Sequence, residues 1–138
     1  LVPTLMPGHI LPAQMEGNPF FTEAIKEKAY AAAAASKENV GKAWAGGVTI
    51  AFGTDTGVTP HGDNAQEFAL MVAAGMSEMD AIRAATVTTS EMLGMSADLG
   101  TIESGKFADI IAVDDNPLDD ITSLERVSAV IRDGKRVK

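Results

Sequence analysis

The sequence predicts an α/β fold, because a buried strand lies between helix-forming segments and a short β-rich segment ends the chain. Residues 48–52 form an apolar run, Val-Thr-Ile-Ala-Phe, between Gly46-Gly47 and Gly53, which is typical of a buried parallel strand. The residues on both sides of this run are rich in helix formers. Near the C-terminus, Asp133-Gly134 separates two β-prone runs and predicts a hairpin with a type I′ turn.

The segment before the buried run is expected to contain a strand, a loop and a helix. Residues 2–5 predict a short strand, whereas residues 6–19 contain several prolines and glycines and predict an irregular loop. His9 lies in this loop and is interpreted as a surface residue. Residues 22–45 predict a helix that has Thr22 as its N-cap and ends at the glycine pair.

After the buried run, three capping patterns predict a layer of helices. In each pattern a residue that can cap a helix is followed three residues later by an acidic residue. The three pairs are Asn64 with Glu67, Ser77 with Asp80, and Thr88 with Glu91. From residue 99 the pattern changes to a turn, a strand over residues 107–113 and the hairpin. We therefore divide the chain into an α/β body, residues 1–98, and a small β unit, residues 99–138.

The composition excludes several classes of partner and site. The chain carries 11 basic and 19 acidic residues, a formal net charge of -8, so binding to nucleic acid or to an anionic membrane surface is not expected. No apolar run approaches the roughly 20 residues that a membrane span needs. The absence of cysteine excludes disulfides and thiolate sites within this sequence. No signal peptide is visible, and the chain is expected to be a piece of a longer protein.

Asp55 is the leading candidate for a functional residue. It follows the buried run directly, within the sequence Gly53-Thr54-Asp55-Thr56-Gly57. In α/β folds, binding and catalytic groups collect just past the C-terminal ends of the strands. A polar loop follows, and within it Pro60-His61-Gly62 carries a second candidate, His61.

Taken in order, these motifs resemble the C-terminal third of a metal-dependent amidohydrolase, and the similarity covers essentially the whole chain. Its most specific part is residues 100–109, Gly-Thr-Ile-Glu-Ser-Gly-Lys-Phe-Ala-Asp. The GTDTG and PHG stretches look most like the imidazolonepropionase-like and Xaa-Pro dipeptidase branch of that superfamily. The other matching segments are Glu67-Phe68 and residues 81–86.

The resemblance implies a (β/α)8 TIM barrel, with residues 2–5 as its seventh strand and residues 49–52 as its eighth, and a small β-sandwich that contains residues 99–138. It implies that Asp55 ligates a divalent metal, with zinc as the expected ion, and handles the proton of the attacking water. The family's remaining ligands are histidines, and often a carboxylated lysine, on earlier strands that this chain does not contain. We therefore expect the isolated chain neither to hydrolyse amides nor to hold zinc tightly.

Further expectations follow from the same resemblance. The parent enzyme is expected to be a cytoplasmic homo-oligomer, completed by an N-terminal barrel portion, that hydrolyses an amide or peptide-like C–N bond in a small-molecule, dipeptide-like or cyclic amide substrate. His61 is a candidate for substrate binding or for a hydrogen bond that anchors its loop. Thr54 and Thr56 are expected to orient the Asp55 loop. Lys106 and Asp109 are interpreted as structural residues of the sandwich.

Two alternatives stay open on the residues alone. Asp55-Thr56-Gly57 is also the active-site signature of aspartic proteases, in which two such loops bring two aspartates together, so a single copy requires a homodimer. The predicted helices on both sides of the motif oppose that all-β fold. The other alternative is a non-enzymatic, soluble α/β domain in which Asp55 caps the following helix.

Overall fold

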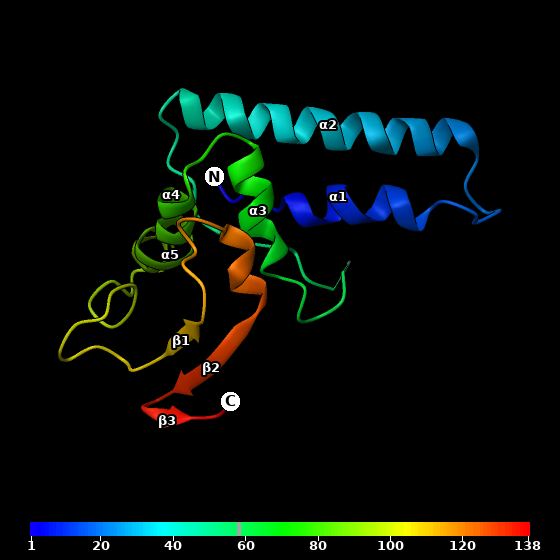
Figure 1. The fold of residues 1–138 in the computed structure, drawn as a ribbon. Coiled ribbons are helices and arrows are strands. Elements are labelled where there is room, and N and C mark those ends of the chain that lie inside the picture. The colour runs from blue at the N-terminus through cyan, green and yellow to red at the C-terminus, as the bar shows by residue number, and fades with distance from the viewer. Residues whose placement is uncertain (58) are drawn as a thin grey trace.

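A computed structural model describes residues 1–57 and 59–138, and its helices and strands are shown in Figure 1. In chain order they are α1 (Leu5–Gln14), α2 (Glu23–Ala45), α3 (Gln66–Ala73), α4 (Glu78–Arg83), the π-helix η1 (Ala84–Thr88), α5 (Thr89–Met92), β1 (Ile110–Val113), the 3-10 helix η2 (Ile121–Glu125), β2 (Val127–Arg132) and β3 (Lys135–Arg136). Helix α2 runs back along α1, α3 crosses near the start of α1, and the strands lie at the opposite end of the molecule from α2 (Figure 1). Among the described residues, none of the helices is both long and apolar enough to cross a membrane.

Helix α2 confirms the predicted helix over residues 22–45, with Thr22 at the N-cap position. The predicted irregular loop over residues 6–19 is wrong, because most of that segment forms α1. Pro7 lies in the first turn of α1, where a missing N–H costs no helical hydrogen bond. A Cβ built on Gly8 would lie 3.5 Å from the Ala33 side chain of α2, so α1 and α2 pack closely here. This packing favours the helical conformation of residues 5–14 despite their prolines.

The apolar run over residues 48–52 is extended, but it forms only the beginning of a parallel ladder. The N-terminal amine of Leu1 donates to the Thr49 carbonyl at 2.8 Å, and the Ala51 N–H donates to the Leu1 carbonyl at 2.9 Å. This alternation is the pairing pattern of parallel strands. Neither predicted strand is assigned in the described chain, since pairing stops after this exchange and α1 begins within residues 2–5.

Residues 78–92 form one continuous helical segment, in which the π-helix η1 joins α4 to α5. The predicted cap at Ser77 is confirmed, because the Asp80 N–H donates to the Ser77 Oγ at 3.1 Å. The predicted cap at Thr88 is wrong, since that residue lies inside the continuous segment. The wider turn of η1 leaves the Ala84 carbonyl able to accept from the Phe52 N–H at 3.1 Å, which ties the helix to the extended run.

A single cluster of buried apolar side chains joins the helices to the extended run. Phe52 and Phe68 pack against it, with their ring centroids 4.4 Å apart. The cluster consists of Leu5, Val40, Ile50, Met71, Met76, Ala81 and Ala84. The apolar run is therefore held in place by the core, which positions the loop that follows it.

The C-terminal strands form an antiparallel sheet in the order β1-β2-β3. Ile111 pairs with Val130, and the register shifts near the end of β1. Asp133 and Gly134 have φ angles of 50° and 71°, which confirms the predicted hairpin and its turn with two positive φ angles. The strand expected over residues 107–113 is shorter in the structure, where β1 begins at residue 110. The division of the chain between residues 98 and 99 stays a prediction.

Candidate functional site

Asp55 lies at the point where the extended run leaves the core. Thr54 is still buried, with 8% of its surface exposed, whereas Asp55 is exposed to solvent. Asp55 has a φ of 51°, in the left-handed region that non-glycine residues adopt infrequently. Gly53 is closely approached by the Val2 side chain, and a Cβ at this position would clash with it. The two extended segments therefore meet immediately before Asp55.

A hydrogen-bond network connects the two threonines that flank Asp55. The Oγ1 atoms of Thr54 and Thr56 lie 2.6 Å apart and share a hydrogen bond. The Asn64 Nδ2 donates to the Thr54 Oγ1 at 3.0 Å and also to the Thr56 Oγ1. The Asn64 Oδ1 accepts from the Gly62 N–H at 3.1 Å. One asparagine side chain thus links both neighbours of Asp55 to the loop that carries the Pro-His-Gly sequence.

Glu67 caps a different helix from the one predicted. Its Oε1 and Oε2 accept from the N–H groups of Leu5 and Met6, each at 2.8 Å. The predicted capping box of Asn64 and Glu67 is therefore wrong. Glu67 accepts hydrogen bonds from backbone N–H groups at the start of α1, and Asn64 donates to threonine hydroxyls beside Asp55. Glu67 is fully buried, and burial raises the pKa of its carboxyl group, an effect that the two backbone hydrogen bonds partly oppose.

The two histidines are both exposed. His61 lies in the loop after Asp55, but no hydrogen bond or ion pair joins these two side chains in the described structure. Its Gly62 neighbour has a φ of 107° and supports the turn of the loop. His9 lies on α1 as a surface residue, as predicted.

The described residues do not supply a metal site of their own. Among them, no group of three or more His, Cys, Asp or Glu side chains is arranged to hold an ion. A structural or catalytic zinc ion usually takes three or four protein ligands. The exposed carboxylate of Asp55 fits a single ligand position, and residues 1–57 and 59–138 do not complete the set.

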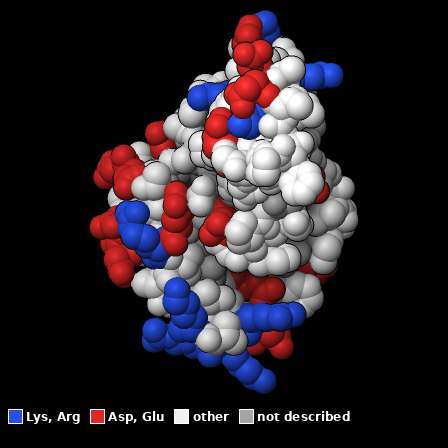
Figure 2. All heavy atoms as spheres, turned by 90° about the vertical axis from the view of Figure 1, so that its right-hand side faces the viewer, with Lys and Arg blue, Asp and Glu red and all other residues white. Residues whose placement is uncertain are grey.

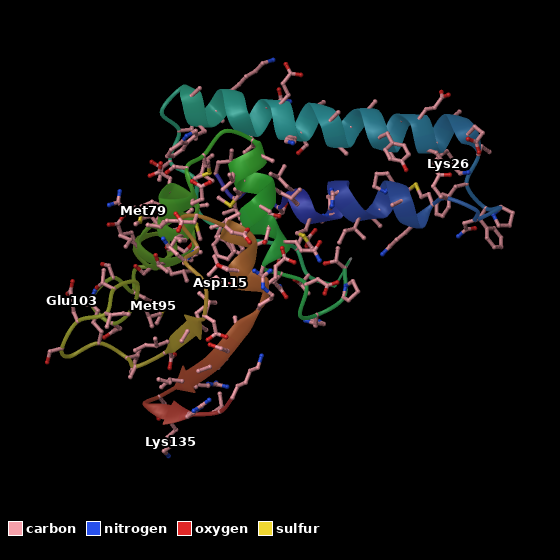
Figure 3. The ribbon with its side chains drawn as sticks, viewed as in Figure 1. Lys26, Met79, Met95, Glu103, Asp115 and Lys135 are labelled. Atoms are coloured by element: carbon pink, nitrogen blue, oxygen red, sulfur yellow. The ribbon has the colours of Figure 1, made fainter. Side chains whose placement is uncertain are left out.

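One cavity is lined by residues that do not include Asp55. It is a groove of about 720 Å³ between the helical segment 78–92 and residues 99–113, and most of its lining is apolar. The loop between α5 and β1, which carries Met95 and Glu103, borders it at the edge of the molecule (Figure 3). The side chains that line it include Phe68, Ile82, Leu93, Leu99, Phe107 and Ile111. A second hollow of about 350 Å³ lies at the start of the extended run, beside Trp44 and Val48.

Charge is distributed unevenly over the surface. In Figure 2 most of the face is uncharged, acidic side chains gather mainly on its left side and at its top, and lysines and arginines gather at its lower end, over the β2-β3 hairpin that carries Lys135 in Figure 3. Near the start of α2, Lys26 donates to Glu23 at 2.7 Å, and this hydrogen bond raises the pKa of Lys26. The basic hairpin residues are Arg132, Lys135, Arg136 and Lys138.

Sequence reasoning identified Asp55, Thr54 and Thr56, which the structure brings together, but it missed the contacts of Asn64 and Glu67. The local spacing predicts both residues as caps of their own helix. Glu67 instead contacts residues that precede it by about sixty positions, at sequence separations of 62 and 61. No local spacing signals such a contact.

Comparison with known proteins matches residues 14–137 to the amidohydrolase family. Ochratoxinase of Aspergillus niger is 43% identical over 86 residues, which cover 61% of this chain and 18% of that protein. The matched segment therefore spans about a fifth of the length of this relative.

Solved structures give a similar result over nearly the whole chain. A Xaa-Pro dipeptidase crystallised with methionine in its active site is 44% identical, with a TM-score of 0.90 over 99% of this chain and 34% of that one. The crystal structure of A. niger ochratoxinase is 33% identical, with a TM-score of 0.80 over 98% of this chain and 31% of that one. The chain thus corresponds to about a third of each of these structures.

Proposed function

The chain belongs to the amidohydrolase family, and from this premise we propose that it is the C-terminal part of a metal-dependent enzyme that hydrolyses an amide or peptide-like C–N bond. The observation that carries the proposal is the agreement of 99% of the chain with a Xaa-Pro dipeptidase at 44% identity. We propose a dipeptide-like substrate on the same ground, with a cyclic amide as the other class. The helices that surround the Asp55 motif oppose the all-β fold of aspartic proteases.

Asp55 is the proposed catalytic residue and metal ligand. In this proposal the segments predicted as strands, residues 2–5 and 49–52, correspond to the last two strands of a (β/α)8 barrel, and the parallel hydrogen bonds between Leu1 and residues 49 and 51 support that arrangement. A divalent ion, zinc in our proposal, supplies an activated water at neutral pH when it is bound. The Asp55 carboxylate accepts a proton from water and returns it to the leaving amine. Its exposed position at the end of the run supports this role.

The neighbours of Asp55 have supporting roles in the proposal. Thr54 and Thr56 orient the loop, a role supported by their mutual hydrogen bond. His61 contacts the substrate, and its exposure in the adjoining loop leaves its imidazole free for that contact. Ligands other than Asp55 come from parts of the parent enzyme outside this chain.

We propose that the partner of this chain is the remaining amidohydrolase polypeptide. The relatives are about three times as long, since the chain covers 34% and 31% of the two solved structures. Strand β1 lies at an edge of the described sheet. Ile111 within the strand and Phe107 before it are 53% and 55% exposed beside the apolar groove. An unpaired edge beside an apolar groove favours an added β-strand. A cytoplasmic homo-oligomer is part of the same proposal for the parent enzyme.

The test is hydrolysis of Xaa-Pro dipeptides and N-acyl amino acids by the full-length enzyme and by two matched variants. Asp55→Asn removes the proposed base and ligand and is expected to lower kcat/KM at least about a hundredfold. Asp63→Asn removes a carboxylate from the same loop and is expected to change kcat/KM less than about twofold. Activity is also expected to disappear with a chelator and to return with zinc. Retention of activity by Asp55→Asn would refute the proposed role.

A further inference from the structure

We propose that the start of α3 positions Asp55, with Asn64 and Glu67 each holding one of the two chain segments that meet there. The inference rests on the proposed function of Asp55. It gives Asn64 and Glu67 a common positioning role. Asn64 bonds the neighbours of Asp55, and Glu67 bonds the residues that follow the N-terminal extended segment.

Both extended segments end in a residue with a left-handed backbone. Thr4 has a φ of 46° and directly precedes α1, and Asp55 has a φ of 51° and directly follows Thr54. A β-branched residue such as threonine adopts this conformation at a steric cost. Such residues persist only where the surrounding structure holds them, and they cluster at functional sites. Each of these two positions therefore needs a restraint from outside its own segment.

Asn64 supplies the restraint on Asp55. Its Nδ2 donates to the hydroxyl oxygens of Thr54 and Thr56, so the residues on both sides of Asp55 are held by one amide. Its Oδ1 accepts from the Gly62 N–H, which fixes the orientation of the amide itself. With both neighbours held, the backbone that carries the Asp55 carboxylate is restrained.

Glu67 supplies the restraint on Thr4. It bonds the first two N–H groups that follow Thr4, each at 2.8 Å, in a fully buried position. The side chains of Val2 and Thr4 in turn approach Gly53, with the Thr4 methyl carbon 3.6 Å from where a Gly53 Cβ would stand. The position of the N-terminal segment thus sets the path of the chain into Asp55. Because Asn64 and Glu67 are three residues apart, one helix start controls both segments.

The test uses the full-length enzyme with Asn64→Ala and with the pair Thr56→Val and Thr56→Ser. Valine keeps the shape of threonine without its hydroxyl, whereas serine keeps the hydroxyl. Asn64→Ala and Thr56→Val are expected to lower kcat about tenfold to a hundredfold with KM changed less than about twofold, because a small displacement of a catalytic group costs rate more than binding. Thr56→Ser is expected to recover most of the kcat. Thr122→Val, which removes a hydroxyl hydrogen bond to Asp120 and leaves the hydrogen bonds of Asn64 in place, is the control.

Hydrogen exchange of the peptide over residues 53–65 provides a readout that does not depend on activity. Faster exchange in Asn64→Ala and Thr56→Val, together with the loss of kcat, supports the positioning role. Unchanged kcat in both variants overturns it, whether or not exchange changes, provided that Asp55→Asn is inactive. If Asp55→Asn stays active, the proposed function fails. In that case, faster exchange in the two variants still supports the restraint of the loop, and unchanged exchange overturns it.

Discussion

Replacing Glu67 with alanine removes the side chain that caps the start of α1 from another helix. The N–H groups of Leu5 and Met6 lose their acceptors, and no helical carbonyl is available to them because they lie in the first turn. Alanine also leaves a small cavity at a fully buried position. We therefore expect local opening of the α1 start rather than loss of the whole fold.

The magnitude follows from the two orphaned donors. Leu5 and Met6 are 6% and 0% exposed, and a buried donor without an acceptor costs about 1–3 kcal/mol. Loss of the buried carboxylate removes its own desolvation cost, which offsets part of this penalty. We expect a net local destabilisation of about 2 kcal/mol, which corresponds to roughly 30-fold faster amide exchange.

Native-state hydrogen exchange of the peptide over residues 4–9 in the full-length enzyme measures this quantity directly. Glu27→Ala is the matched control, because Glu27 is exposed in the second turn of α2. The control is expected to change exchange of that peptide less than about twofold. Equal exchange in Glu67→Ala and Glu27→Ala would refute the assignment of Glu67 as the cap of α1.

Three further predictions concern other contacts. Burial raises the pKa of Glu67 in the folded protein, so its contribution to stability is present below the ordinary glutamate pKa and is lost as pH rises through the folded pKa. Glu67→Gln is expected to flatten the dependence of the unfolding free energy on pH over this range, and an unchanged pH dependence would contradict the prediction. Gly53→Ala is expected to lower the melting temperature through overpacking of about 1–3 kcal/mol, whereas Gly8→Ala, where contacts are ordinary, is expected not to lower it. Ser77→Ala is expected to cost about 1 kcal/mol of unfolding free energy and Thr88→Ala less than half of that, because of these two residues only Ser77 caps a helix. Equal costs would show that the Ser77 cap contributes nothing.

Local structure was predictable where neighbouring residues alone carry the energetics. The long helix over residues 22–45, the Ser77 cap and the Asp133-Gly134 turn depend on helix propensity, a short-range hydrogen bond and positive φ angles. The position of Asp55 past an apolar run was likewise readable from the sequence. Whether this run forms a complete strand could not be predicted. A strand requires hydrogen-bonded partners, and the described residues supply only the two hydrogen bonds with Leu1.

The sequence by itself determined the family, the candidate carboxylate Asp55, the Ser77 cap and the Asp133-Gly134 turn. Only the tertiary structure decided that α1 forms despite its prolines, because packing of Gly8 against α2 favours a helix there. It also decided where Asn64 and Glu67 make their hydrogen bonds. Those bonds satisfy backbone and hydroxyl groups far away in sequence, whose need for a partner arises only when burial removes them from water.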